Sequence, residues 1–120
     1  FILGDTQKEN NFSNINASKE IRREYFNVVH QGMRQAVTGG TATLLNVPYV
    51  EVSAKTGTAQ LGVAKNKVNS SVVGFFPSEN PKYAIMIMME AGPTGNSVNA
   101  STVMKELLDW MSINTPEYFE

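Results

Sequence analysis

Four consecutive residues, Lys55 to Thr58, combine an amine, two hydroxyls and a glycine. The amine of Lys55 is positively charged, and the hydroxyls of Thr56 and Thr58 can donate hydrogen bonds to a carboxylate. Gly57 has no side chain, so the backbone of a bound peptide can approach closely there. These residue types favour a ligand that carries an acidic group. The alternative is that Lys55 is a solvent-facing strand lysine and Gly57 marks a β-bulge.

The rest of the composition excludes several other kinds of site. The chain has 120 residues, no cysteine and one histidine, which excludes disulfides, thiolate metal sites and a zinc site built from several histidines. The formal net charge is −1 with acids and bases interspersed, which argues against nucleic-acid binding. No apolar run is long enough to cross a membrane, so we expect no membrane contact by this segment. We expect neither a metal nor a cofactor.

A small set of helices and strands must position these residues. Ser18 is suited to cap a helix, and Gly39-Gly40 is suited to stop it. Three apolar runs separated by turn residues then predict antiparallel strands, and Asn99 is suited to cap a last helix. The predicted elements are a helix over 18–38, strands over about 49–61, 68–76 and 83–91 with a hairpin connection over 77–82, and a helix over 99–112. This order predicts an α+β fold, an antiparallel sheet flanked by helices.

The length of the chain predicts a single domain. Residues 1–17 are polar and predict a loop or linker, residues 18–112 predict the folded core, and residues 113–120 predict a tail. The chain does not begin with Met and opens with the apolar segment Phe1 to Gly4. We therefore expect a cut through a larger protein, with a mature N-terminus left by processing as the alternative.

Apolar spacing predicts which faces are buried. In the run 83–91 both alternating sets of side chains are apolar, which is typical of a strand covered on both sides. We therefore expect Met86, Met88 and Met89 to fill the core. The first helix has its predicted stripe at Ile21, Tyr25, Val28, Val29, Gly32, Met33 and Val37. The last helix has its predicted stripe at Val103, Leu107, Trp110 and Met111, with Trp110 against the sheet.

The surroundings of Lys55 extend the motif well beyond three residues. Residues 55–60 read Lys-Thr-Gly-Thr-Ala-Gln, and over most of 18–112 the chain resembles the transpeptidase domain of class B penicillin-binding proteins. Lys-Thr-Gly is the third signature of the penicillin-recognising serine enzymes. Ala54 is a departure, because this family usually has glycine there. The flanks that fit in order and spacing are Gly32-Met33, Gly39 to Ala42, Val73 to Pro77 and Asn80 to Gly92.

The resemblance implies the C-terminal half of the serine transpeptidase/β-lactamase fold and a D,D-transpeptidase as the parent protein. Such an enzyme cleaves the D-Ala-D-Ala end of a peptidoglycan stem peptide by acyl transfer. The resemblance implies that Lys55 is catalytic, in the active-site proton network, and that Lys55, Thr56, Gly57 and Thr58 bind substrate. It also implies an open edge strand to which an extended peptide adds, with the Thr58 backbone N–H as an oxyanion-hole donor.

The resemblance also implies partners and a location. The implied partners are the stem peptide, β-lactam antibiotics and the remainder of the transpeptidase domain. The implied location is the extracytoplasmic face of the bacterial plasma membrane, with the anchor in parts of the parent outside this chain. In the family, upstream strands lie beside the last strand, so residues 83–91 are expected to present an unpaired edge here.

The serine nucleophile of the family is missing from these residues. No Ser-x-x-Lys occurs in the 120 residues, so we expect the chain to be inactive by itself. Ser-x-Asn triplets begin at Ser78, Ser97 and Ser112, but all follow Lys55, whereas the family places its Ser-x-Asn earlier. We interpret them as a turn, a helix cap and a helix end. His30 is interpreted as structural or solvent-facing, because the family uses lysine and serine for proton transfer.

Three other functions stay open at this point. A serine β-lactamase shares the fold and the Lys-Thr-Gly motif, although the context of residues 55–60 fits it less well. A penicillin-sensing receptor domain would bind the same ligands without turnover, and a degenerate domain would be purely structural. The sequence upstream and the lifetime of an acyl-enzyme formed with a β-lactam would separate them.

Overall fold

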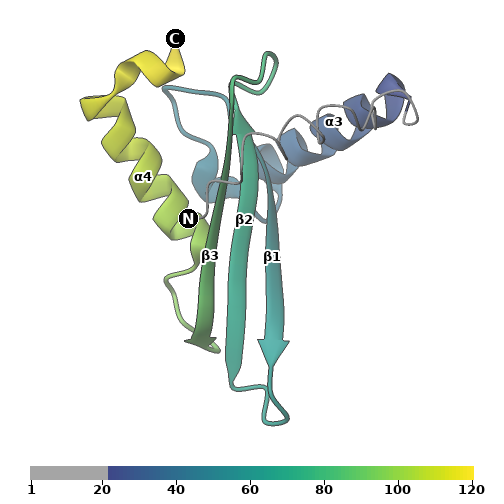
Figure 1. The fold of residues 1–120 in the computed structure, drawn as a ribbon, viewed down its shortest axis with the longest axis vertical. Coiled ribbons are helices and arrows are strands. Elements are labelled where there is room, and N and C mark those ends of the chain that lie inside the picture. The colour runs from purple at the N-terminus through teal and green to yellow at the C-terminus, as the bar shows by residue number, and fades with distance from the viewer. Residues whose placement is uncertain (1–21) are drawn as a thin grey trace, which may run out of the picture.

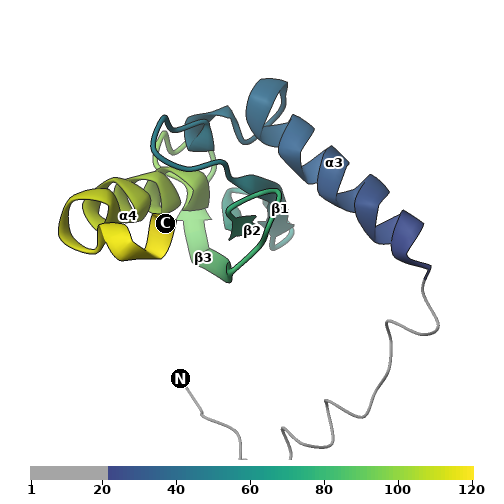
Figure 2. The ribbon, with the colours of Figure 1, turned by 90° about the horizontal axis from the view of Figure 1, so that it is seen from above.

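The computed structural model of the chain describes residues 22–120, so the predicted linker over 1–17 and the predicted cap Ser18 lie outside the described residues. The fold is an antiparallel sheet with helices beside it, which confirms the predicted α+β class (Figure 1). The elements are α3 (Arg23–Gly39), η1 (Thr43–Leu45), β1 (Ser53–Leu61), β2 (Lys67–Phe76), β3 (Tyr83–Pro93), α4 (Ala100–Asn114) and η2 (Pro116–Phe119). Seen from above, α3 lies beyond β1 and α4 lies beside β3 (Figure 2).

The three strands pair in the order β1-β2-β3, and both pairings are antiparallel. Among residues 22–120, β1 and β3 are therefore the two edges of the sheet. The pairing of β1 with β2 runs without interruption, and Gly57 lies opposite Ser71. The alternative that Gly57 marks a bulge is therefore wrong. The irregularity of the sheet lies instead between Val68 and Ser70, in the pairing of β2 with β3.

The start of β1 differs from the predicted strand over 49–61. The strand begins at Ser53, and residues 49–52 approach it without strand pairing. One reason is that the Val52 carbonyl accepts a hydrogen bond from Arg34 Nη1 of α3, at 2.9 Å. This bond satisfies the Val52 carbonyl without a partner in the neighbouring strand. The other two strands agree with their predicted ranges to within two residues.

The core lies between one face of the sheet, α4 and the segment that joins α3 to β1. Residue Val37 is the only buried side chain of α3. The buried hydrophobic residues are Val37, Ala42, Leu45, Val50, Val52, Ala54, Val72, Phe76, Ala100, Met104 and Leu108. The core therefore depends on α4 and the sheet much more than on α3, whose N-terminal half extends away from the strands (Figure 1).

The start of α4 follows the sequence, but its buried face does not. Asn99 caps the helix through a capping box, in which its side chain accepts from the backbone N–H groups of Ser101 and Thr102. The predicted stripe is right only in part, because Met111 packs against the core whereas Leu107 is 38% exposed and Trp110 is 56% exposed. The helix instead buries Ala100, Ser101, Met104 and Leu108. Both stripes have helical spacing, and the small residues of the first turn let that face approach the sheet most closely.

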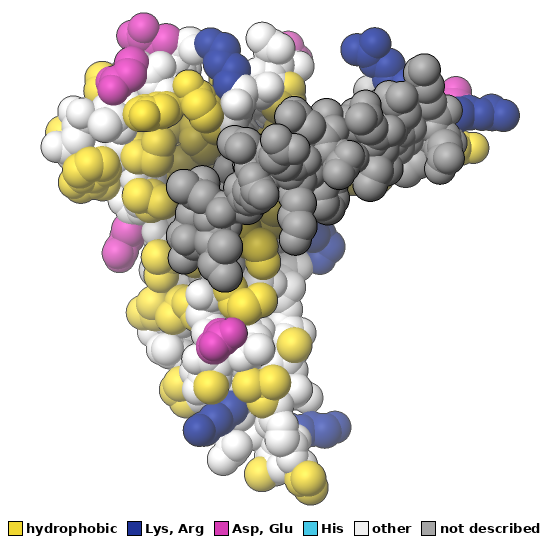
Figure 3. Space-filling view, in the orientation of Figure 1, with side chains coloured by type: hydrophobic (Ala, Val, Ile, Leu, Met, Phe, Trp, Pro, Cys, Tyr) yellow, Lys and Arg dark blue, Asp and Glu magenta, His cyan; other side chains and the backbone are white. Residues whose placement is uncertain are grey.

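The expectation that β3 is covered on both faces does not hold among residues 22–120. Met86 and Met88 are 62% and 50% exposed, while Ile85 and Ile87 on the other face pack against the core. Only one face of the sheet lies under α4, so Met86 and Met88 have no layer over them among the described residues. The same applies to much of the predicted α3 stripe, since Tyr25, Val28 and Val29 are exposed. Hydrophobic side chains therefore remain on the surface over α4 and the strands (Figure 3).

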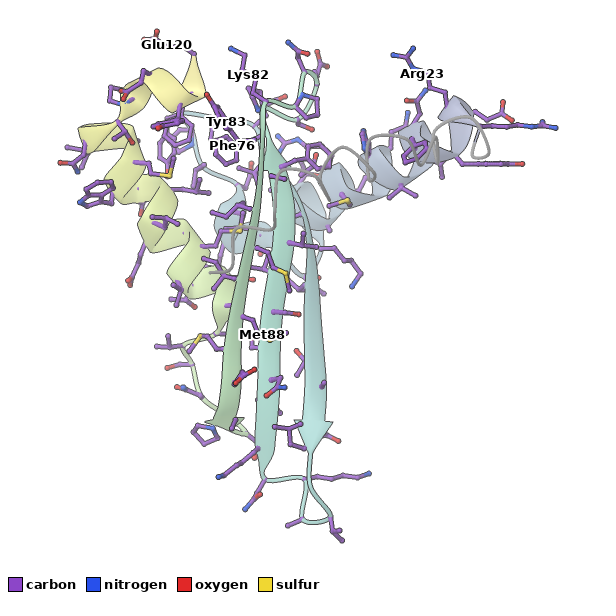
Figure 4. The ribbon with its side chains drawn as sticks, viewed as in Figure 1. Arg23, Phe76, Lys82, Tyr83, Met88 and Glu120 are labelled. Carbon is purple, nitrogen blue, oxygen red and sulfur yellow. The ribbon has the colours of Figure 1, made fainter. Side chains whose placement is uncertain are left out.

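Residues 113–120, which were expected to form a tail, are structured. Helix α4 continues to Asn114, and η2 follows over Pro116–Phe119. The ring of Phe119 lies 5.5 Å from that of Phe76 and packs against the core. Figure 4 shows Phe76 and Tyr83 at the end of the sheet near the C-terminus, where Lys82 Nζ donates to the Glu120 carbonyl. The packing of its aromatic side chains explains why this segment is ordered.

Candidate functional site

The predicted site residues lie together on an edge strand. Lys55, Thr56, Gly57 and Thr58 occupy the third to sixth positions of β1, which pairs with β2 on one side only. Lys55 and Thr58 are exposed, and Thr56 and Gly57 are partly buried. Among the described residues no strand pairs with the other side of β1, so alternate backbone N–H and C=O groups on that side are available to a ligand.

The side chains of this segment point alternately to two different faces. Lys55 lies opposite Val73, on the face that carries the exposed Met86. Thr56 lies opposite Val72, on the face that is buried under α4 farther along the strand. Because side chains alternate along a strand, Lys55 and Gly57 share one face and Thr56 and Thr58 share the other. The charge and the hydroxyls of the segment therefore approach its open edge from opposite sides.

A polar cavity of about 240 Å³ lies against this segment. It is lined by Thr41, Thr56, Gly57, Thr58, Ser70, Ser71, Asn99 and Ser101. All of these residues except Gly57 carry a hydroxyl or an amide, and none carries a charge. The cavity can therefore donate several hydrogen bonds to an acidic or peptidic group without an intrinsic preference for a hydrophobic one. It lies at the N-terminal end of α4, where Ser70 Oγ accepts from the Ala100 N–H at 3.0 Å.

A side chain at Gly57 would meet the hydroxyl of Ser71. A Cβ at this position would lie 2.6 Å from Ser71 Oγ on the neighbouring strand. Ser71 Oγ in turn lies 3.5 Å from the Gly57 carbonyl oxygen, to which it donates. A side chain at this position would therefore require the Ser71 hydroxyl to move, while the backbone of Gly57 has no left-handed conformation.

Thr41 is a site residue that the sequence did not single out. Its hydroxyl lies 2.8 Å from the hydroxyl of Thr56 and lines the same cavity. The signal available in the sequence is the segment Gly39 to Ala42, which resembles a flank of the family's motif. The two threonines are 15 positions apart, so local spacing does not predict their contact.

The remaining candidate residues lie elsewhere and have structural contacts. The ring of His30 packs against that of Phe75 at 4.6 Å, which agrees with a structural role. Ser78 lies in the turn between β2 and β3 and shares a 2.6 Å hydrogen bond with the buried Ser53. Ser112 Oγ donates to the Asp109 carbonyl at 2.7 Å near the end of α4. Together with the cap at Asn99, these contacts agree with a turn, a cap and a helix end for the three Ser-x-Asn triplets.

Residues 22–120 contain neither a cluster of metal ligands nor a helix that could span a membrane. No group of three or more histidine or acidic side chains is placed to hold a metal ion within this range. Over the same residues, no helix combines the length and the apolar character needed to span a membrane.

Comparison with known proteins places this geometry in a family. A family model described as the penicillin binding protein transpeptidase domain matches residues 7–109. The peptidoglycan D,D-transpeptidase FtsI of Buchnera aphidicola subsp. Baizongia pistaciae is 29% identical over 129 aligned residues, which cover 98% of this chain and 22% of that protein.

Solved structures show the same fold. Penicillin-binding protein 2B of Streptococcus pneumoniae matches with a TM-score of 0.63 and 25% identity, over 80% of this chain and 17% of that one. The D,D-transpeptidase domain of a peptidoglycan glycosyltransferase from Eggerthella lenta matches with a TM-score of 0.57 and 26% identity, over 72% of this chain and 20% of that one. Pseudomonas aeruginosa PBP2, in complex with WCK 5153, matches with a TM-score of 0.52 and 33% identity, over 68% of this chain and 18% of that one.

The chain spans 17–22% of the lengths of these four relatives. It therefore corresponds to part of a transpeptidase domain. The resemblance that the sequence predicted is confirmed at the level of family and fold.

Proposed function

Because the chain belongs to the transpeptidase domain family of the penicillin-binding proteins, we propose that it supplies the substrate-binding strand of a serine-type D,D-transpeptidase. The observation that supports this proposal best is the position of Lys55 to Thr58 on the open edge of β1, beside a polar cavity. The substrate class is a peptidoglycan stem peptide that ends in D-Ala-D-Ala. β-Lactams, which resemble this ending, are ligands of the same strand.

An extended peptide binds by adding to the free edge of β1 as a further strand. Main-chain hydrogen bonds provide most of the affinity in this mode of recognition, and pockets for particular groups provide the specificity. The Lys55 Nζ lies 2.5 Å from the Thr56 carbonyl oxygen, so this carbonyl is within reach of groups outside the sheet. Gly57 adds no side chain that would hold a peptide away from the strand.

The acidic end of the peptide is bound by the side chains of the same segment. The Thr56 and Thr58 hydroxyls donate to its carboxylate, and the Lys55 ammonium adds a favourable charge from the other face of the strand. A carboxylate that accepts several charge-assisted or neutral hydrogen bonds is held in a defined orientation. That orientation places the preceding peptide bond at the reaction centre.

The acyl-transfer step needs a serine from the part of the parent outside this chain. Its oxygen attacks the carbonyl of the penultimate residue, the terminal D-alanine leaves with a proton on its amine, and an amine of a second stem peptide then displaces the serine. The Thr58 N–H donates to the oxygen of the tetrahedral intermediate. One such donor contributes about 3–4 kcal/mol of transition-state stabilisation. Lys55 is a catalytic residue in the proton network around the serine.

Two consequences follow for the chain by itself. It has no acyl-accepting serine of its own, and it is inactive without the remainder of the domain. The parent acts on peptidoglycan at the extracytoplasmic face of the plasma membrane and is anchored through segments outside this chain.

The test is covalent labelling of the full-length parent with a fluorescent penicillin. We expect Lys55→Ala to abolish labelling and Lys67→Ala to leave it unchanged, since Lys67 is an exposed lysine at the far end of the neighbouring strand. Equal labelling of the Lys55→Ala variant would contradict the proposal. The covalent adduct of the wild-type parent with penicillin should persist for longer than one turnover of the transpeptidase reaction. The parent should also form cross-linked dimers from stem peptides. Rapid loss of the adduct with release of hydrolysed penicillin would indicate a β-lactamase instead.

A further inference from the structure

The Thr41 hydroxyl is fixed in place by the turn that ends α3. The backbone N–H groups of Gly40 and Ala42 both donate to the Ala36 carbonyl, at 3.1 and 2.9 Å. A Cβ at Gly40 would lie 2.8 Å from Ala36 Cα, so the turn needs glycine to close this tightly. Ala42 is fully buried, and η1 begins directly after it. Thr41 is therefore an exposed side chain on a backbone that is held on both sides.

This backbone holds the Thr41 hydroxyl 2.8 Å from the hydroxyl of Thr56. We propose that Thr41 is a positioning residue for substrate recognition, which orients the Thr56 hydroxyl toward the acidic end of the ligand. This inference rests on the proposed function and extends it to a residue outside the Lys-Thr-Gly segment. The position of Thr56 alone does not determine which group accepts the proton of its hydroxyl. The proposed role of Thr41 is to determine that acceptor.

Each of the two hydroxyls has a single proton to donate. A carboxylate only accepts hydrogen bonds, so Thr56 can bind it only by donating its one proton to it. In that state the Thr56 oxygen can still accept, and Thr41 must be the donor of the bond between the two hydroxyls. A donor at this position favours the one orientation of Thr56 that directs its proton away from Thr41. Hydrogen bonds in such a chain also polarise one another.

The neighbouring hydroxyls of the cavity do not replace this contact. Ser70 Oγ accepts from the Ala100 N–H, and Ser71 Oγ donates to the Gly57 carbonyl. Both lie on β2 and are engaged with backbone groups. Thr41 approaches Thr56 from the turn that follows α3, outside the sheet, and so it can restrict the Thr56 rotamer without occupying the strand edge on which the ligand lies.

The test compares Thr41→Val with Thr41→Ser in the full-length parent. Valine keeps the shape of threonine and removes the hydroxyl, while serine keeps the hydroxyl. The readout is the rate of covalent acylation by a penicillin with a free carboxylate and by its methyl ester. We expect Thr41→Val to slow acylation by the free acid roughly five- to tenfold, the effect of one neutral hydrogen bond, and to leave the rate for the ester nearly unchanged. Thr41→Ser should behave like the wild type with both ligands.

Each other outcome has a separate meaning. An equal loss for acid and ester, or a wild-type rate for Thr41→Val with the acid, overturns the positioning role. A Thr41→Ser variant as slow as Thr41→Val also overturns it, because the hydroxyl would then not be the active group. Equal melting temperatures of the three proteins are expected, since Thr41 is exposed. If the wild-type parent is not acylated at all, the proposed function itself fails, and the role of Thr41 fails with it.

Discussion

Lys55 and Thr56 are consecutive residues of β1, yet their side chains lie on opposite faces of the sheet, and Lys55 Nζ donates to the Thr56 carbonyl oxygen at 2.5 Å. The ammonium group thus already lies at a backbone acceptor of the segment. A ligand that contacts both the ammonium and the Thr56 hydroxyl must lie along the edge between the two faces. This relationship explains why an edge strand, rather than a loop, is suited to hold a peptide and its acidic end together.

The first prediction concerns the backbone of the same segment. In a strand, alternate residues direct their N–H and C=O groups to the same side, so the Thr58 N–H is expected on the side of the accessible Thr56 carbonyl. Thr58→Pro removes this N–H without removing a bond to β2. We expect the parent carrying Thr58→Pro to remain folded and its acylation by penicillin to slow about 10²–10³-fold, the effect of losing one oxyanion donor.

Thr58→Val is the matched control for this change. It keeps the N–H and removes the hydroxyl, so we expect a loss of no more than about tenfold. Circular dichroism would check that both variants fold. Collapse of the fold of the proline variant would show that the Thr58 N–H faces β2, and acylation of this variant at the wild-type rate would show that the N–H does not serve the oxyanion.

The second prediction concerns the packing of α4 on the sheet. Met104 is fully buried, and its Cε would lie 3.2 Å from a Cβ added at Gly74 of β2. Met104→Ala leaves a cavity at this contact, and we expect it to lower the free energy of unfolding by about 2–5 kcal/mol. Val63→Ala, in the fully exposed turn between β1 and β2, should change it by less than about 0.5 kcal/mol. Urea denaturation of the parent's transpeptidase domain measures both; similar values for the two variants would place Met104 outside the core.

The third prediction concerns pH and the contact between Asp109 of α4 and the segment before β1. Asp109 accepts from Lys105 Nζ at 2.5 Å and from the Tyr49 hydroxyl at 2.7 Å. The hydrogen bond from Lys105, followed by that from Tyr49, lowers the pKa of the Asp109 carboxyl. A lowered pKa means that the contribution to stability is complete above the unfolded pKa of about 4 and is lost as pH falls through the folded value. Asp109→Asn should therefore flatten the acid limb of the profile of melting temperature against pH.

Tyr49 makes the stability of the fold depend on pH in the opposite direction, at alkaline pH. Burial, then the hydrogen bond to Asp109 and its negative charge, raise the pKa of the Tyr49 hydroxyl above its ordinary value. The contribution of Tyr49 to stability is therefore complete below about pH 10, and it is lost as pH rises through the higher pKa of the folded state. We expect Tyr49→Phe to flatten the alkaline limb of the melting-temperature profile. An unchanged slope on both limbs, in Asp109→Asn and in Tyr49→Phe, would mean that this contact contributes nothing to folding.

Local features of the fold agreed with the sequence where a few neighbouring residues are sufficient. The capping residue Asn99, the turn over 77–82 and the strand that carries Lys55 to Thr58 all follow from residue types within one or two turns of chain. The family was likewise evident from residues 55–60 and their flanks. Each of these features depends on contacts between residues that are close in sequence, or on a motif that can be read directly.

Burial could not be predicted in the same way. The stripe Val103, Leu107 and Trp110 has the same helical spacing as the buried set that contains Met104 and Leu108, and spacing alone does not decide between them. Met86 and Met88 have the apolar character of core residues, but their exposure depends on whether another layer covers that face. Which apolar surface is buried depends on elements distant in the chain.

The amino-acid sequence by itself determined the chemistry that this protein offers: an amine, two hydroxyls and a glycine on one extended segment, in the context of a known family. The open edge was implied by the resemblance to that family, and the tertiary structure alone decided that the Thr41 hydroxyl contacts that of Thr56 and that a polar cavity lies against the segment. The physical reason is that residue type sets what a side chain can donate or accept, while its direction and its neighbours are set by strand pairing and by the α3 turn, whose partners lie tens of positions away.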